Sequence, residues 1–234
     1  MRLQRPPWFL GGLALLLSAA GAQGQGTFQN LGFESASLVP VSDISVQFAP
    51  AFPHWTCTVA GVQQTVAIYN TVALSESGIC IIDQGWPYAP YGGVIDGNYT
   101  AILMGGVLGP LNPADTTLSQ TGLVPGVAQS LRLKAYNIGS ASPLIPLVVT
   151  LGGQQLSLVP LGGGANYTLL GADIHTLAGH TAELDFTMRG SLDSNTVFLD
   201  SIQFSNLPVP EPSVFGLFGL GALLAGGHVL RRRR

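Results

Sequence analysis

Short runs of strand-forming residues, each ending at glycine, proline, asparagine or aspartate, dominate this sequence. Seven such runs stand out: Gln64–Tyr69, Gly78–Asp83, Tyr99–Met104, Ser130–Tyr136, Leu144–Leu151, Thr181–Met188 and Val197–Phe204. No long amphipathic helix competes with them, and the one expected helical turn, Asp173–Ala178, is too short to form a layer. Many short strands at this spacing predict an all-β fold in which two sheets pack as a β-sandwich.

Two of these runs indicate how the sheets are sided. In Thr181–Met188 apolar and polar residues alternate, so one face is expected in the core and the other in water. In the last run Asp200 has the same parity as Phe198, Ile202 and Phe204. A carboxylate on such an apolar face needs hydrogen-bond donors, a basic partner or a cation.

The N-terminus has the pattern of a secretory signal peptide. Arg2 and Arg5 form a positively charged region, Trp8–Leu17 is apolar, and Ala20–Ala22 is an A-x-A cleavage signal. We therefore expect residues 1–22 to direct export through the Sec translocon, which leaves 23–206 as one ectodomain of ordinary size.

The C-terminus has the pattern of a membrane anchor. A proline-rich linker, residues 207–213, contains Pro210, Glu211 and Pro212, and the apolar residues 214–230 follow it. At about 1.5 Å per residue this segment covers about 25 Å, slightly less than the roughly 30 Å of a bilayer core. The basic end, Arg231, Arg232, Arg233 and Arg234, is expected to stay in the cytoplasm. The short, glycine-rich span suits a temporary anchor, and a buried core helix is the alternative.

This order of a Pro-Glu-Pro motif, a short apolar helix and a basic end resembles the PEP-CTERM sorting tail. Gram-negative bacteria use that tail for surface proteins that an exosortase processes. The resemblance implies export, transient anchoring in the inner membrane, processing near Pro210–Pro212 and delivery to the cell surface or the extracellular matrix.

The ectodomain is strongly acidic once both ends are set aside. Between Glu34 and Asp200 it holds eleven acidic residues against three basic ones, Arg132, Lys134 and Arg189, a net charge of −8. Nucleic acid and anionic lipid surfaces are therefore poor partners, because they require clustered lysine and arginine. An extracellular solute, a neutral glycan or a divalent cation fits this charge better.

The two cysteines, Cys57 and Cys80, are expected to form a disulfide in the oxidising periplasm. Such a bridge would stabilise the fold by about 3 kcal/mol through its effect on the unfolded chain. A pair of buried free thiols is the alternative.

Four motifs recur in an order that resembles the galactose-binding-like jelly roll of many carbohydrate-binding modules. They are Asn30–Glu34, Gln120-Thr121 followed by Pro125-Gly126, Leu151–Gly153 and Phe198–Ile202, and the resemblance covers residues 28–205. It implies a structural calcium ion held partly by Glu34 and Asp200, a role that hard carboxylate ligands suit. The alternative has Glu34 in solvent and Asp200 accepting backbone N–H bonds.

One loop is rich in aromatic residues, since Trp86, Tyr88 and Tyr91 fall within ten residues, Gln84–Gly93. Such rings either stack on sugars or anchor the loop on the sandwich. Catalytic signals are sparse, because no G-x-S-x-G elbow is present and Glu183 and Asp185 fit a solvated strand face. We expect a non-enzymatic surface or matrix protein associated with exopolysaccharide, with a specific glycan-binding module as the alternative and a glycan-active hydrolase as the weakest one.

Overall fold

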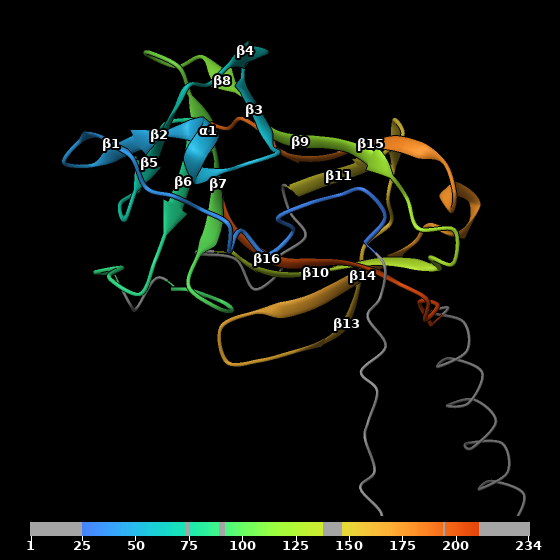
Figure 1. The fold of residues 1–234 in the computed structure, drawn as a ribbon. Helices are drawn as coiled ribbons and strands as arrows, with labels where there is room; N and C mark the ends of the chain where they lie inside the picture. Colours follow the sequence, from blue (N-terminus) through green and yellow to red (C-terminus); the bar gives the residue numbers. More distant parts are fainter. Residues whose placement is uncertain (1–24, 74, 89–91, 138–146, 194, 211–234) are drawn as a thin grey trace, which may run out of the picture.

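The computed structural model of the chain describes residues 25–73, 75–88, 92–137, 147–193 and 195–210, and these form two β-sheets packed face to face (Figure 1). Their helical content is small: α1 (Phe48–Ala51) has four residues and the 3-10 helix η2 (His175–Leu177) has three. The predicted all-β, two-sheet sandwich is confirmed.

The larger sheet, sheet A, has ten strands in the order β1-β2-β5-β6-β7-β16-β10-β14-β13, with β8 paired to β7 beside this path. The strand bounds are β1 Pro40–Ser42, β2 Ser45–Gln47, β5 Val66–Tyr69, β6 Gly78–Ile82, β7 Thr100–Val107, β8 Pro113–Ala114, β10 Ser130–Asn137, β13 Val159–Gly163, β14 Thr168–Asp173 and β16 Asn195–Ser205. Strands β5 and β6 pair in parallel and the other described pairs of this sheet are antiparallel.

The smaller sheet, sheet B, has six strands in the order β12-β11-β15-β9-β3-β4. Their bounds are β3 Thr56–Val59, β4 Val62–Gln63, β9 Thr116–Leu123, β11 Leu147–Leu151, β12 Gln154–Gln155 and β15 Thr181–Met188. Each of the seven runs predicted from the sequence overlaps a strand, and the predicted helical turn contains η2.

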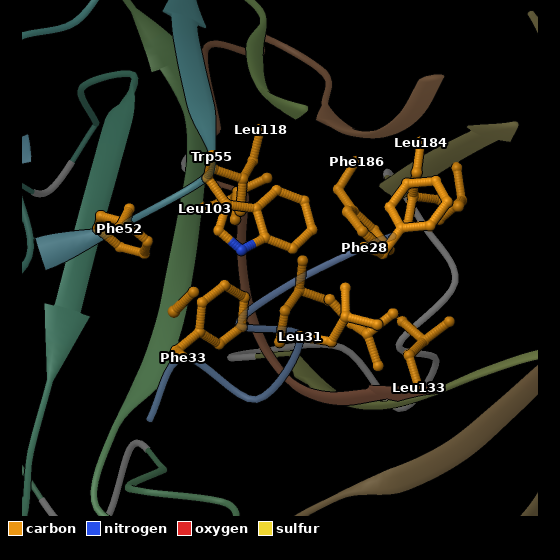
Figure 2. Close-up of a cluster of buried hydrophobic side chains, with 14 of the residues drawn as sticks. Phe28, Leu31, Phe33, Phe52, Trp55, Leu103, Leu118, Leu133, Leu184 and Phe186 are labelled. Carbon is orange, nitrogen blue, oxygen red and sulfur yellow. The ribbon is translucent and has the colours of Figure 1, made fainter. Parts of the chain in front are cut away.

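The main core lies between the two sheets and includes a segment that belongs to neither (Figure 2). Phe28, Leu31 and Phe33 come from the irregular N-terminal segment and lie between the inward faces of both sheets. The Phe33 ring is fully buried and its centroid is 5.8 Å from that of Trp55, which in turn is 6.2 Å from Phe186 of β15. Because burying a side chain of this size stabilises by about 1.5–3 kcal/mol, the N-terminal segment contributes directly to folding.

A second hydrophobic cluster covers the other face of sheet A, and we call it the outer cluster. Its buried members are Cys80, Ile82, Trp86, Ile102, Met104 and Phe198. The loop that follows β6 supplies Trp86, and Val94 and Ile95 pack against the cluster from the same loop. Strands β6 and β7 therefore have apolar residues on both faces, which explains why their sequences are continuous apolar runs rather than alternating ones.

Candidate functional site

The alternation of side chains between the two faces of sheet A is interrupted in strand β16 at Ser201. This residue has a left-handed backbone with φ of +47°, and β16 carries one extra residue relative to β10 at this point. A bulge of one residue moves the following side chains to the opposite face. Asp200 therefore lies on the outer face with Phe198, whereas Ile202 and Phe204 point into the main core. The predicted grouping of Asp200 with Ile202 and Phe204 is wrong because the bulge resets the alternation.

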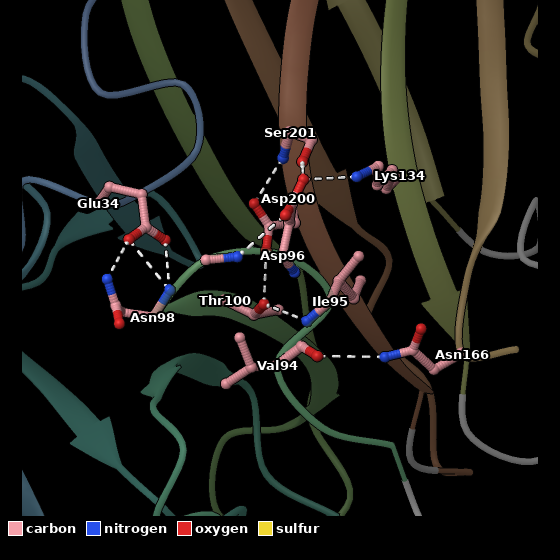
Figure 3. A network of polar contacts seen from close by, with 11 residues as sticks. Glu34, Val94, Ile95, Asp96, Asn98, Thr100, Lys134, Asn166, Asp200 and Ser201 are labelled. Atoms are coloured by element: carbon pink, nitrogen blue, oxygen red, sulfur yellow. Dashed lines mark hydrogen bonds and ion pairs between the residues drawn. The ribbon is translucent and has the colours of Figure 1, made fainter. Parts of the chain in front are cut away.

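Asp200 is buried, with 1% of its surface exposed, and protein donors surround its carboxylate (Figure 3). The Ser201 N–H donates to Oδ1 at 2.6 Å, while the Asp96 N–H and the Thr100 hydroxyl donate to Oδ2 at 3.1 and 2.6 Å. The Thr100 hydroxyl oxygen also accepts a hydrogen bond from the Ile95 N–H at 2.9 Å, so the hydroxyl proton of Thr100 is donated to Asp200. These donors satisfy the buried group, as a buried carboxylate requires.

Burial raises the pKa of Asp200 to about 6. The hydrogen bonds from Thr100, Ser201 and Asp96 oppose this shift because they stabilise the ionised form, and the negative charge of Asp96 adds to it. Asp200 is thus an acid whose titration falls well above that of an ordinary aspartate, although it is still ionised at neutral pH.

Glu34, at the end of the opening motif, binds the same loop from the other side. Its carboxylate accepts the Asn98 N–H at 2.9 and 3.0 Å, the Asn98 side-chain amide at 2.9 Å and the Tyr99 N–H at 3.1 Å. Gly97, in the left-handed region with φ of +61°, leaves the space that this carboxylate occupies. The two predicted residues, Glu34 and Asp200, are therefore brought to one short loop, residues 96–100.

Asp96 links this loop to strand β10. Its Oδ2 lies 2.5 Å from Lys134 Nζ and accepts the Ser201 hydroxyl at 3.0 Å. The bond from Lys134, followed by that from Ser201, lowers the pKa of Asp96. The Lys134 ammonium also lies 5.0 Å from the centroid of the Tyr167 ring. Because the Asp96 side chain is 58% exposed, this ion pair orients the loop more than it stabilises the fold.

No pattern in the sequence singles out Asp96, Asn98 and Thr100 as site residues. The available signal was the Asp96-Gly97-Asn98 triplet, whose residue types are typical of tight turns. That signal marks a turn but does not identify the two distant carboxylates that hold it.

The calcium ion expected at Glu34 and Asp200 stays a prediction. The part of the chain that the structure describes contains no group of three His, Cys, Asp or Glu side chains that could hold a metal ion. A melting measurement with calcium or EDTA decides the matter, since an ion that binds the folded state alone raises the melting temperature.

The aromatic loop anchors itself on sheet A. Trp86 is 9% exposed, and its ring makes edge contacts with Phe198 at 6.0 Å and with Tyr88 at 5.1 Å between centroids. Tyr88 is 43% exposed, and Tyr91 lies outside the described residues. Of the three predicted ligand-contacting rings, Tyr88 is the one that the structure places at the surface.

The predicted disulfide is wrong, because Cys57 and Cys80 are free and buried. Cys57 belongs to β3 of sheet B and points into the main core, whereas Cys80 belongs to β6 of sheet A and points into the outer cluster. The two side chains thus face different layers, and a disulfide requires Cβ atoms that face each other at about 4 Å. Burial raises the pKa of each thiol to about 12, so both stay protonated.

The outward face of sheet B carries many hydroxyl groups, and we call it the hydroxyl face. Its hydroxyl residues are Thr56, Thr58, Thr117, Ser119, Thr121, Thr150, Thr181 and Thr187, accompanied by Glu183 and Asp185. Some of them bond to one another, with Thr117 and Thr187 oxygens 2.9 Å apart and Thr150 donating to Asp185 at 2.7 Å. The strands β3, β9, β11 and β15 contain no lysine or arginine.

After β16 the chain continues along the outer face of sheet A. The Ser130 hydroxyl donates to the Leu207 carbonyl at 2.7 Å, and the Arg132 guanidinium lies 3.4 and 3.5 Å from the carbonyls of Leu207 and Pro208. Pro210 is the last described residue, so Glu211, Pro212, residues 214–230 and Arg231–Arg234 lie outside the described part, as does the predicted signal peptide, residues 1–22. Within the described ranges no helix is long and apolar enough to cross a bilayer.

A comparison with known protein families identifies the C-terminal segment. Residues 208–234 match the PEP-CTERM protein-sorting motif. The chain is thus an exported protein with a C-terminal sorting signal, associated with the membrane until an exosortase-type enzyme processes it. No curated protein sequence matches this chain.

Two solved structures are distantly similar to this chain. One is TmCBM61, determined in complex with β-1,4-galactotriose, with 13% identity, a TM-score of 0.41, and coverage of 78% of this chain and 99% of that one. The other is the secreted serine protease VesC from Vibrio cholerae, with 10% identity, a TM-score of 0.29, and coverage of 74% of this chain and 43% of that one. Likenesses this distant say nothing about ligand or activity.

Proposed function

We propose that this chain is a non-enzymatic protein of the cell surface or extracellular matrix, whose β-sandwich associates with extracellular polysaccharide. The sorting motif at residues 208–234 carries the proposal, because it implies that the ectodomain is delivered outside the cell. We place the chain in a Gram-negative bacterium, which exports it through the Sec translocon. Its C-terminus stays in the cytoplasm until processing, after which the ectodomain is released or retained at the cell surface.

The hydroxyl face supports the association with polysaccharide. Side-chain hydroxyls and carboxylates can exchange hydrogen bonds with sugar hydroxyls, and the absence of lysine and arginine from its four main strands gives no attraction to phosphate polymers. Each such contact is weak in water, but a polymer with a repeating structure engages many of them at once. A broad polar sheet face suits weak, repeated contact with a matrix better than tight binding of one small sugar.

The test is co-sedimentation of the full-length chain, held in mild detergent, with exopolysaccharide isolated from the producing bacterium. Thr58→Val and Thr121→Val together remove two hydroxyls from the hydroxyl face while keeping side-chain shape. We expect the bound fraction to fall, whereas Thr65→Val, an exposed position outside that face, leaves it unchanged. If the double variant still binds, the polysaccharide contacts a surface other than the hydroxyl face. If the wild-type chain does not co-sediment, the association is refuted.

A specific glycan-binding module remains the second candidate, and the exposed ring of Tyr88 favours it. A glycan array probed with the full-length chain and with Tyr88→Ala separates the two. A defined oligosaccharide that binds the wild type and is lost in Tyr88→Ala would favour the module, whereas binding to polymer alone favours the matrix protein.

A further inference from the structure

A groove lies where the sandwich meets the sorting tail. Its walls come from the β13–β14 hairpin, from β10 and from the linker, and its volume is about 670 Å³. The lining residues are Arg132, Val159, Pro160, Leu161, Leu169, Leu207, Pro208 and Pro210. Apart from Arg132 these side chains are apolar, so the groove suits an apolar side chain better than a hydrated sugar polymer.

The folded domain holds the linker against this groove. Ser130, which is fully buried, and Arg132 bind the carbonyls of Leu207 and Pro208. Val209 is half-buried, and it reaches the β14 backbone at Gly171, where a side chain would contact Val209 and Leu161. The first residues of the sorting motif are therefore fixed on the sandwich rather than hanging free of it.

Arg132 differs from the other basic residues of the described domain. Lys134 pairs with Asp96 and Arg189 pairs with Asp115. Arg132 forms no ion pair with any described residue, and its contacts are the Ser130 hydroxyl and the two linker carbonyls. A guanidinium carries five donors, so this one has capacity for a carboxylate or carbonyl from a partner.

We propose that this groove is a docking surface for the extracytoplasmic part of the processing enzyme. The inference rests on the proposed function, because it assumes that the sorting motif is processed. Pro208 and Pro210 line the groove and also belong to the motif at residues 208–234, so an enzyme that grips the start of the motif also meets the groove. The partner segment inserts an apolar side chain between Leu161 and Leu169 and presents a carboxylate or carbonyl to Arg132.

This arrangement makes processing depend on folding. The groove needs the β13–β14 hairpin, and the hold on Leu207 needs Ser130, which is positioned when β10 pairs with Ser205 of β16. An unfolded ectodomain would present the sorting motif without either feature. The enzyme would therefore act on folded domains in preference to unfolded ones.

The first experiment follows conversion of the full-length chain to the processed form in the producing bacterium by pulse-chase labelling. Arg132→Ala and Leu161→Asp remove the charge and the apolar wall of the groove. We expect each to slow conversion by about tenfold, the effect of losing one charge-assisted contact or one buried apolar contact. Arg189→Ala, a basic residue that is not in the groove, is the matched control and converts at the wild-type rate. Protease resistance of each full-length variant shows that the domain is folded.

The second experiment places a photo-crosslinking amino acid at Leu161 in cells that carry an epitope-tagged processing enzyme. We expect a crosslink to the tagged enzyme from Leu161 and none from Val62, which is 65% exposed on β4 of the other sheet. A crosslink from Leu161 to a second copy of the chain or to lipid, in place of the enzyme, would overturn the proposal.

Glu211→Ala, within the sorting motif, distinguishes failure of the docking surface from failure of the proposed function. If Glu211→Ala blocks conversion while both groove variants convert normally, the docking surface is refuted and the proposed function stands. If Glu211→Ala is itself converted normally, the proposed route of processing fails, and the docking surface fails with it.

Discussion

Thr100 and Asp200 share a hydrogen bond of 2.6 Å that joins the start of β7 to the bulge of β16. Both residues are buried, and the direction of the bond is fixed because Thr100 accepts the Ile95 N–H. The bond connects residues 100 positions apart in the sequence. It therefore holds loop 96–100 against the strand that also carries the sorting tail.

Stability should depend on the titration of Asp200. Its folded pKa of about 6 lies above the unfolded value of about 3.9, so the folded state binds more protons between these values. The contribution of Asp200 to stability is then fully present at about pH 4 and is lost as pH rises to about 6, by about 2–3 kcal/mol in all. Urea unfolding across this pH range measures the effect.

Asp200→Asn provides the control for that slope. Asparagine stays neutral, so the fall in stability between about pH 4 and pH 6 should disappear in this variant. Asp83, Asp96 and Asp173 have lowered pKa values and lose their contributions as pH falls further, on the acid side of this range. A wild-type slope that persists in Asp200→Asn would show that another group causes it.

Gly97→Ala should weaken the loop that Glu34 holds. A Cβ at this position would overlap the Glu34 carboxylate, and the left-handed backbone adds strain. We expect a loss of about 2–3 kcal/mol in the free energy of unfolding, made up of about 1 kcal/mol of strain and the displaced hydrogen bonds. Gly61→Ala has a similar φ of +78° with open space around it, so it should cost about 1 kcal/mol. Equal costs in chemical denaturation would mean that Glu34 contributes nothing.

The sequence predicted strands well where apolar residues mark them and poorly where they do not. Strand β15 was predicted with its observed bounds because its alternation is regular. Strand β9 was missed, since its inward positions include Gln120 and Gly122. Gln120 exchanges two hydrogen bonds with the Gln29 backbone, and Gly122 makes room for the Phe28 ring, so both serve the N-terminal segment.

The candidate site shows the same limit. Strand parity singles out Asp200, motif resemblance adds Glu34, and the structure brings both to one loop. The bulge at Ser201 could not be read from the sequence, because its left-handed backbone follows from pairing with β10 rather than from a glycine. Cysteine pairing failed for a related reason, since an even count gives no information about which layer each side chain faces.

The free thiols lead to a simple prediction about redox sensitivity. Because Cys57 and Cys80 are unpaired, a reducing agent should leave the melting temperature unchanged. Thiol titration of the unfolded chain should find two free groups per molecule, and the folded chain should react slowly because both thiols are buried and protonated. A melting temperature that falls on reduction would contradict the structure.

Trp86 allows ring packing to be separated from hydrogen bonding. Its Nε1 is buried and has no hydrogen-bond partner among the described residues, which costs about 1–3 kcal/mol. Trp86→Phe removes the unsatisfied N–H but keeps most of the ring against Phe198, so its free energy of unfolding should stay within about 1 kcal/mol of the wild type. Trp86→Ala leaves a cavity in the outer cluster and should lower the free energy of unfolding by about 3–5 kcal/mol. Tyr88→Ala, at an exposed ring, should cost less than about 1 kcal/mol. Denaturant unfolding of the three variants measures these differences, and a large loss in Trp86→Phe would mean that the indole N–H makes a bond that matters for stability.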